Sequence, residues 1–539
     1  MSSKIQKGEV LLDIKGLKIQ GFSDEKWHDI VNGVDISLRR GEVMGLIGES
    51  GAGKSTLGLA AMGYTQPGCR ITDGEINFDG VDLAKLKENE KRKYWGNRMT
   101  YVAQSAAASF NPAHRLIKQT TASTIRSGFK ETNEAYKDAK ELYRTLNLPD
   151  PNNIGDRYPH QVSGGQLQRV MTAMAMSPRP DLIIFDEPTT ALDVTTQVEV
   201  LSSMRAIVEE FNTAAIYITH DLAVVAQMAD FIKVLRYGDE VEEAPTKEML
   251  KNPKEAYTKS LWSVRSLEKE KISPQAPILE IKDLDAAYGS IKVLHKINIS
   301  VPRGSTVAVV GESGSGKSTA ARVITGLLPQ LNGEVKFEGV DLPPKLEDRS
   351  KEQKRRIQMI YQMADTAMNP RQTVREIIGR PLEFYLGMIG PKKESRVLEL
   401  LEMIELDGRF LDRLPSELSG GQKQRICIAR ALAAEPDFVI CDEVTSALDQ
   451  IVQEGILKLL MRLQNDLNLT YLFITHDIST VKAISDQVVV MNLGEVVEQG
   501  EKEHVFSPPH PPYTELLLSS VPEMDPDWLT NLNSCRAEA

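Results

Sequence analysis

The sequence predicts two consecutive α/β domains, each built on a mostly parallel β-sheet with helices on both faces. One set of motifs occurs twice in the same order, and apolar runs stand directly before the motifs. Three pairs of matched residues, Ser163 and Ser419, Asp186 and Asp442, and His220 and His476, are each 256 positions apart. A constant offset over so long a stretch is typical of a duplicated domain.

The apolar runs are the expected sheet strands. Residues 43–47 and 306–310 lead into glycine-rich loops, and residues 182–185 and 438–441 lead into Asp-Glu pairs. Continuous apolar strands of this kind are typical of a parallel sheet that is buried on both faces. Each half is long enough to bury a core of its own.

The boundary between the halves is marked by composition. Residues 268–277 are charged at first and then carry prolines, which predicts a linker. The first domain is therefore expected over residues 1–267 and the second over residues 278–539. Because the linker is short, the two domains should meet at high effective concentration.

Composition narrows the classes of protein. The net charge of −11 disfavours a nucleic-acid partner, which needs a basic surface. No apolar run reaches the roughly 18 residues that a membrane span needs, and the first residues lack an apolar signal core, which favours a cytoplasmic chain. The four cysteines have no metal-ligand spacing.

Each glycine-rich loop has the pattern G-x-x-x-x-G-K-[ST] of a phosphate-binding loop. Its backbone N–H groups and the following helix N-terminus bind phosphate, Lys54 and Lys317 should reach the β- and γ-phosphates, and Ser55 and Ser318 should bind Mg²⁺. The expected nucleotide contacts in the two loops are Gly48, Glu49, Ser50, Gly51, Ala52, Gly53, Lys54, Ser55 and Thr56, and Gly311, Glu312, Ser313, Gly314, Ser315, Gly316, Lys317, Ser318 and Thr319.

The Asp-Glu pairs supply the chemistry expected beside these loops. Asp186 and Asp442 can hold Mg²⁺, and Glu187 and Glu443 can polarise the water that attacks the nucleotide. An isolated Asp-Glu pair is usually a solvated loop, but here each pair follows a buried strand and a phosphate loop. The predicted cofactors are therefore ATP and Mg²⁺.

A Ser-Gly-Gly-Gln segment opens a helix in each half and is a second expected anion site. One γ-phosphate cannot easily reach both anion sites of one domain. A sandwich of the two domains resolves this, with each ATP held between one domain's phosphate loop and the other's serine. The residues expected in this contact are Ser163, Gly165, Gln166, Ser419, Gly421 and Gln422.

In this combination of motifs the chain resembles the ATP-binding-cassette (ABC) ATPase family, twice over. The resemblance implies a helical subdomain in each half. It also implies that Gln104 and Gln362 contact Mg²⁺ and that His220 and His476 contact the γ-phosphate. The aromatic residue that stacks on adenine would be Tyr288 in the second half and Phe22 in the first, with Trp27 as the alternative.

The ends of the halves indicate a subfamily. Residues 252–261 and 507–517 are proline- and tyrosine-bearing tails, which resemble those of dipeptide, oligopeptide and nickel importers. The resemblance implies two transmembrane permease subunits, an extracytoplasmic solute-binding protein and a peripheral position on the cytoplasmic face of the bacterial inner membrane. The alternatives are the tandem ATPase of a sugar importer and a ribosome-associated ABC protein.

Overall fold

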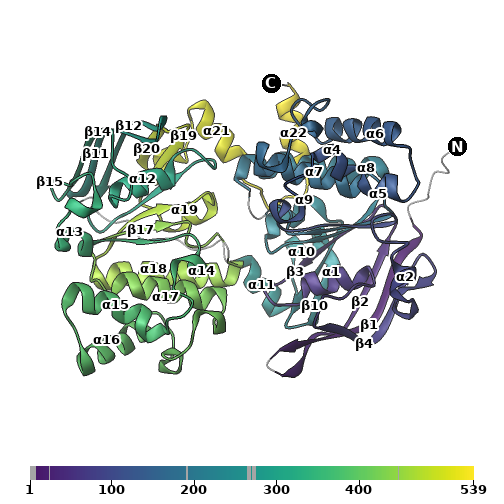
Figure 1. Ribbon diagram of the computed structural model, residues 1–539, viewed down its shortest axis with the longest axis horizontal. Coiled ribbons are helices and arrows are strands. Elements are labelled where there is room, and N and C mark those ends of the chain that lie inside the picture. The colour runs from purple at the N-terminus through teal and green to yellow at the C-terminus, as the bar shows by residue number, and fades with distance from the viewer. Residues whose placement is uncertain are drawn as a thin grey trace. The chain divides into compact units, whose positions relative to one another are not determined.

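The computed structural model describes residues 8–23, 25–189, 192–263, 269, 275–446 and 448–538. They form two compact units (Figure 1). The first comprises Met1–Ser263 together with Pro522–Ala539, and the second comprises Val264–Val521.

A six-stranded sheet forms the centre of the first unit, in the order β10-β9-β3-β8-β7-β6. Its strands are β3 (Val43–Ile47), β6 (Met99–Val102), β7 (Leu182–Asp186), β8 (Ala214–Ile218), β9 (Phe231–Arg236) and β10 (Asp239–Pro245). All pairings are parallel except that of β9 with β10, and every residue of β3, β7 and β8 is buried. The predicted mostly parallel sheet is confirmed, and its buried strands explain the continuous apolar runs.

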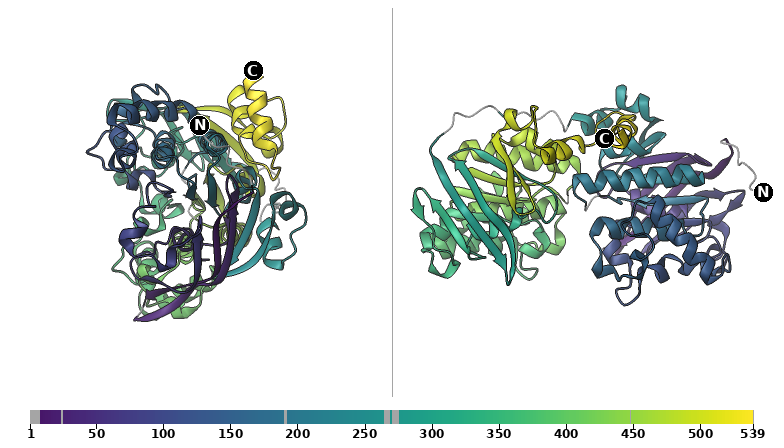
Figure 2. Two further views of the ribbon diagram at one scale, coloured as in Figure 1. Left: turned by 90° about the vertical axis from the view of Figure 1, so that its right-hand side faces the viewer. Right: turned by 90° about the horizontal axis from the view of Figure 1, so that it is seen from above.

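A second, antiparallel sheet packs against it, which the sequence did not predict. Its order is β2-β1-β4-β5, from β1 (Val10–Ser23), β2 (Lys26–Arg39), β4 (Cys69–Phe78) and β5 (Val81–Asp82). Figure 2 shows its long strands in purple. Helix α1 (Lys54–Ala61) contributes Leu57, Ala60 and Ala61 to the core that both sheets share.

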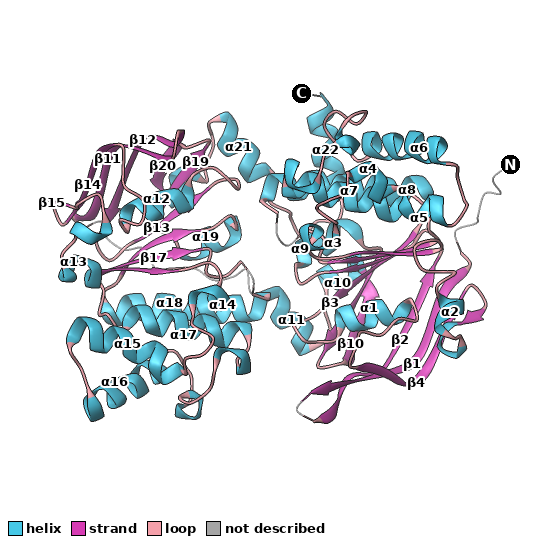
Figure 3. Ribbon diagram, viewed as in Figure 1, coloured by secondary structure: helices cyan, strands magenta, loops and turns pink. Residues whose placement is uncertain are grey.

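The predicted helical subdomain is present (Figure 3). Its apolar side chains, many of them from α7, share one hydrophobic core with residues of β7 and β8 in the six-stranded sheet. Its helices, with the long helix that follows β7, are α3 (Ala106–Ser109), α4 (Leu116–Thr120), α5 (Ala122–Arg126), α6 (Thr132–Thr145), α7 (Gly164–Met176) and α8 (Val194–Phe211). The unit also contains α2 (Glu88–Lys91), α9 (Leu222–Met228), α10 (Thr246–Lys251) and α11 (Ala256–Ser263).

The second unit repeats this plan. Its six-stranded sheet, in the order β16-β17-β18-β13-β19-β20, consists of β13 (Thr306–Val310), β16 (Ile357–Ile360), β17 (Phe438–Asp442), β18 (Thr470–Ile474), β19 (Gln487–Asn492) and β20 (Glu495–Glu501). Its antiparallel sheet consists of β11 (Pro277–Tyr288), β12 (Ile291–Pro302), β14 (Asn332–Phe337) and β15 (Val340–Asp341).

The helices of the second unit follow the order of the first, except that the single helix α15 takes the place of α4 and α5. They are α12 (Lys317–Ile324), α13 (Lys351–Arg356), α14 (Ala364–Ala367), α15 (Val374–Leu386), α16 (Gly390–Met403), α17 (Gly420–Leu432), α18 (Gln450–Leu467), α19 (Ile478–Ile484), α20 (Lys502–Val505) and α21 (Pro512–Ser519). No helix in the described parts of either unit is long and apolar enough to cross a membrane.

The last residues of the chain group with a different unit from the one that the sequence predicts. Residues 522–539 were expected in the second domain, but they group with the first unit. The physical reason is α22 (Trp528–Glu538), whose Leu529 is buried in a hydrophobic core of the first unit. Most of the expected linker, residues 268–277, lies outside the described residues.

Candidate nucleotide-binding sites

The first phosphate loop connects the end of β3 to the start of α1. Lys54 is buried, and its Nζ donates hydrogen bonds to the carbonyl oxygens of Gly48 and Glu49, both at 2.8 Å. Gly53 caps the helix with a φ of +91°, and a Cβ on Gly48 would lie 2.2 Å from the carbonyl oxygen of Leu235. Both positions therefore need glycine, and the loop wraps around the lysine.

The second loop has the same geometry. Lys317 Nζ donates to the carbonyl oxygens of Gly311 and Glu312, both at 2.7 Å. Gly316 has a φ of +103°, and a Cβ on Gly311 would lie 2.1 Å from the carbonyl oxygen of Met491. The two loops thus hold their lysines and their first and last glycines in matching arrangements.

The candidate Mg²⁺ ligands of each unit lie together. Ser55 Oγ donates to Asp186 Oδ1 at 2.9 Å, and Ser318 Oγ donates to Asp442 Oδ1 at 3.0 Å. Burial raises the pKa of both aspartates, although their hydrogen bonds to the serines favour the charged form. A hydroxyl and a carboxylate beside a phosphate loop fit the oxygen ligands that Mg²⁺ prefers.

Glu187 lies between the first unit's other two candidates. Gln104 Nε2 donates to Glu187 Oε2 at 3.0 Å, and His220 Nδ1 is 3.1 Å from Glu187 Oε1. Burial lowers the pKa of His220, but the hydrogen bond and the charge of Glu187 outweigh it, so the pKa is raised overall. The glutamate backbone has a φ of +46°, a conformation rare outside glycine that often marks functional sites.

The second unit repeats this cluster around Glu443, whose φ is +49°. Gln362 Nε2 donates to Glu443 Oε2 at 2.6 Å, and His476 Nδ1 lies 3.5 Å from Glu443 Oε1. Burial raises the pKa of Glu443, but the hydrogen bond and charge of His476 outweigh this and lower it. In both units the predicted glutamine, glutamate and histidine therefore meet at the carboxyl edge of the sheet.

The Ser-Gly-Gly-Gln segments form helix starts, as predicted. Gln166 N donates to Ser163 Oγ at 3.3 Å, and Ser163 N donates to Gln166 Oε1 at 3.2 Å, so the two residues form a capping box on α7. A Cβ on Gly165 would lie 2.2 Å from Thr196 Cγ2, which explains the glycine by close packing on α8.

Ser419 and Gln422 form the same capping box on α17. Ser419 N donates to Gln422 Oε1 at 3.0 Å, and Gln422 N donates to Ser419 Oγ at 3.3 Å. A Cβ on Gly421 would lie 2.5 Å from Val452 Cγ1 on α18. Both segments therefore present a capped helix N-terminus of the kind that binds anions.

The adenine-stacking candidates lie at the tips of the β1–β2 and β11–β12 hairpins. Phe22 and Trp27 pair across the first hairpin, with ring centroids 5.2 Å apart, and the guanidinium of Arg70 lies 3.9 Å from the Trp27 ring centroid. Tyr288 is 41% exposed and accepts a hydrogen bond from Arg322 at 2.8 Å. Because Phe22 and Trp27 are neighbours, the structure keeps both as candidates in the first half.

A contact that the sequence did not predict distinguishes Asp186 from Asp442. Tyr101 OH donates to Asp186 Oδ2 at 2.5 Å. The residue at the matching position of β16 is Met359, since Tyr101 pairs with Ile184 and Met359 pairs with Ile440 in equivalent registers. The first aspartate is therefore held by two hydroxyl groups, whereas the second has a methionine in place of the tyrosine.

A second missed contact joins each tail to its phosphate loop. Glu49 N donates to the hydroxyl of Tyr257 on α11 at 3.2 Å, and Glu312 N donates to the hydroxyl of Tyr513 on α21 at 3.0 Å. The two tyrosines are 256 positions apart, the same offset that relates the motifs, and this was the signal that could have revealed them.

Replacing these tyrosines by phenylalanine is expected to weaken ATP binding. In Tyr257→Phe and Tyr513→Phe, a backbone N–H at the start of the phosphate loop loses its acceptor, at a cost of about 1–3 kcal/mol. We expect the affinity of the altered site for ATP to fall about tenfold, measured by titration with a fluorescent ATP analogue. Tyr237→Phe, at a tyrosine that is 69% exposed, is the control. Unchanged affinity in both loop variants would contradict a role for the tails in the loops.

Comparisons with known proteins agree with the motifs. The ABC transporter family model matches residues 31–190 and 294–446, and the model of the oligopeptide/dipeptide transporter C-terminal region matches residues 497–538. The chain is 35% identical over 562 residues to the glutathione import ATP-binding protein GsiA of Salmonella typhimurium, covering 96% of this chain and 90% of GsiA. It is 33% identical over 570 residues to GsiA of Escherichia coli K12, covering 97% and 91%.

Among solved structures, cbiO1 from Clostridium perfringens, part of the ABC transporter complex cbiONQ, is 29% identical, with a TM-score of 0.40 over 43% of this chain and 91% of cbiO1. The two segments that match the ABC transporter family model together span more than half of the chain. The chain therefore belongs to the ABC transporter family and is an ATPase with two ATP-binding domains.

Proposed function

We propose that this chain is the energy-coupling ATPase of a bacterial ABC importer for peptides or a closely related small solute. The observation that carries the proposal is the combination of two ABC transporter family domains with an oligopeptide/dipeptide-type C-terminal region in one chain. The similarity to glutathione import proteins over nearly the whole chain supports a peptide solute, since glutathione is itself a short peptide. Nickel, opines and oligosaccharides are the other solutes to test.

The reaction is ATP + H₂O → ADP + phosphate at each site. Lys54 and the loop N–H groups bind the β- and γ-phosphates, and Glu187 orients and polarises the attacking water. Ser55, Asp186 and Gln104 would hold Mg²⁺, which when bound offsets the phosphate charge.

In the second site the corresponding residues are Lys317, Glu443, Ser318, Asp442 and Gln362. His220 and His476, which contact the catalytic glutamates here, would turn to the γ-phosphate and stabilise the charge that develops on it.

The two units are proposed to act as an internal pseudo-dimer. Each ATP would then lie between one unit's phosphate loop and the capped helix of the other unit that begins at Ser163 or Ser419. Because ATP meets both surfaces only in the closed state, ATP binding favours closure and hydrolysis favours reopening.

The partners follow from the family. The proposed complex contains two transmembrane permease subunits and an extracytoplasmic solute-binding protein, with this chain peripheral on the cytoplasmic face of the inner membrane. The acidic net charge of −11 supports a complex without nucleic acid.

Uptake by the native host tests this function. In a strain that lacks the gene, wild-type protein should restore uptake of labelled glutathione or dipeptides, and the Glu187→Gln, Glu443→Gln variant should not. Labelled sugar and nickel uptake are measured in the same cells. If peptide uptake is normal without the gene and sugar uptake is lost, the result favours the ATPase of a sugar importer. If peptide uptake is normal and the protein co-sediments with ribosomes at high salt, the result favours a ribosome-associated ABC protein.

A further inference from the structure

The end of the chain returns to the first unit. The C-terminal strap, defined here as residues 522–538, follows the last residue of the second unit, Val521, and packs on α8 and α9. In the sequence the second unit therefore lies between two parts of the first. It is joined to the first unit at both ends, through the segment after Ser263 and through the strap.

A single buried glutamine binds the strap backbone. Gln227 on α9 is 2% exposed, and its Nε2 donates to the carbonyl oxygens of Glu523 at 2.8 Å and Asp525 at 2.9 Å. Its Oε1 accepts a hydrogen bond from Leu529 N at 3.0 Å. Without the strap, a buried amide would lose three main-chain partners, which is costly in a protein interior.

The apolar anchor of the strap is Leu529. It is 1% exposed and belongs to the core cluster that contains Leu201 and Met204 of α8 and Val224 of α9. Trp528 and Leu532 pack against the same cluster. Because Leu529 is buried so fully, the strap contributes to the hydrophobic core of the first unit, and this burial stabilises its docking.

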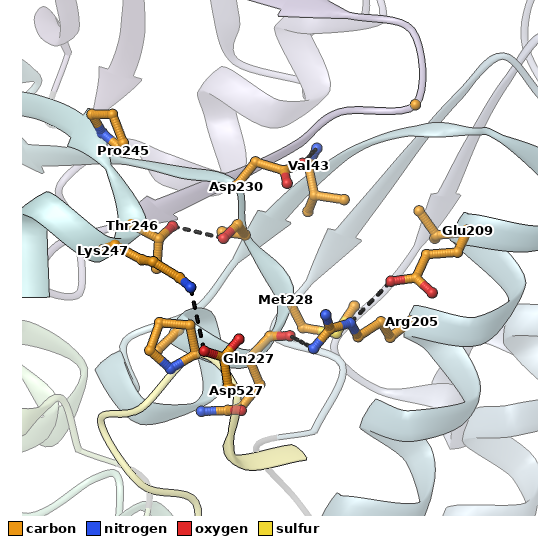
Figure 4. Close-up of a pocket in the computed structure, with 15 residues that line it drawn as sticks. Val43, Arg205, Glu209, Gln227, Met228, Asp230, Pro245, Thr246, Lys247 and Asp527 are labelled. Carbon is orange, nitrogen blue, oxygen red and sulfur yellow. Dashed lines mark hydrogen bonds and ion pairs between the residues drawn. The ribbon is translucent and has the colours of Figure 1, made fainter. Parts of the chain in front are cut away.

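Polar contacts surround this anchor. Ser202 Oγ donates to Asn533 Oδ1 at 3.1 Å, and Lys247 Nζ lies 3.3 Å from Asp527 Oδ2. Figure 4 shows Asp527 beside Lys247 and Gln227, at the edge of a pocket of about 430 Å³ that the strap helps to line. The ion pair is well exposed and adds little stability, so the glutamine and the leucine carry the docking.

The docking surface is specific to the first unit. Helix α9 follows His220 as α19 follows His476, and the residue 256 positions after Gln227 is Ala483. Alanine offers no amide to bind a strap backbone. The strap therefore continues from the second unit in sequence, but the glutamine that binds it belongs to the first unit.

We propose that the C-terminal strap is a second tether, which holds the second unit to the first when no nucleotide joins them. The first tether is the short connection after Ser263. Two attachments restrict the separation of the units more than one does, and so raise their effective concentration for each new closure. In this proposal the surface formed by α8 and α9 binds the strap of its own chain and not that of a second copy.

Cutting the first tether isolates the second. A protease site placed within residues 270–274 of the full-length protein is cleaved without nucleotide, and the product is examined by size-exclusion chromatography with light scattering. We expect the two fragments to elute together as one particle of the mass of a single chain. With Leu529→Asp, the fraction that elutes together should fall at least about tenfold. Asn531→Asp, at an exposed position of α22, adds the same charge and should leave the particle intact.

Further variants separate docking from misfolding. Truncation after Val521 and Gln227→Ala should both release the fragments, and an excess of a peptide of residues 522–539 should release them from the unmodified strap. Binding of a fluorescent ATP analogue by the released fragments shows that they remain folded. The proposal is overturned if the fragments separate with the strap intact, if they stay together after truncation, or if the uncut protein is a strap-exchanged dimer.

Discussion

A chain that carries Glu187→Gln and Glu443→Gln together is expected to bind ATP and to hydrolyse it at least about 1,000-fold more slowly than the wild type. General-base catalysis contributes about 10²–10⁴-fold, and glutamine keeps the shape of glutamate but cannot accept the proton of the attacking water. Glu187 and Glu443 are the glutamates that each lie between a glutamine and a histidine at the sheet edge. Phosphate release under saturating ATP measures the effect.

The matched control is the pair Glu210→Gln and Glu402→Gln, at exposed positions on helices of the first and second unit. It removes the same two charges and should hydrolyse ATP at the wild-type rate. Rapid turnover by the Glu187→Gln, Glu443→Gln protein would show that other groups activate the water. The two single variants report on each site separately and therefore on the effect of Tyr101, which only the first site has.

Lys54→Ala and Lys317→Ala should each abolish tight ATP binding at one site and spare the other. Each lysine is buried and holds two loop carbonyls at 2.7–2.8 Å, so its loss removes a phosphate contact and the internal support of the loop. Charge-assisted hydrogen bonds of this kind contribute about 1.5–3 kcal/mol each, which predicts a loss of affinity of about 100-fold at the altered site.

Equilibrium binding of radiolabelled ATP, with the number of sites fitted, measures this loss. The controls are Lys251→Ala in the first unit and Lys392→Ala in the second, since both lysines are exposed. Neither change should alter the ATP affinity of either site. Two sites of unaltered affinity in either loop variant would contradict the assignment of the lysines.

The sequence was most informative where the chemistry is local. The phosphate loops, the Asp-Glu pairs and the capped helices each lie within a few consecutive residues, and their spacing follows from how a strand, a loop and a helix join. The buried strands were equally visible, because a strand covered on both faces is apolar throughout. Local patterns of this kind are therefore enough to predict the strands, the loops and the residues of the candidate sites.

What the sequence did not reveal depends on long-range contacts. The antiparallel sheet pairs β1 with β4, and the hydroxyl of Tyr257 reaches the loop residue Glu49, more than 200 positions away. The burial of Leu529 in the first unit also has no local signal, because a single leucine in a tail has no periodicity to interpret. The aromatic position stayed open between Phe22 and Trp27 because the two side chains are cross-strand neighbours.

One chain is proposed to hold two working ATP sites. The most direct test is to count the ATP molecules retained by the Glu187→Gln, Glu443→Gln protein after rapid removal of free nucleotide, by native mass spectrometry. We expect two ATP molecules per chain of 539 residues. One ATP per chain, or none, would contradict it.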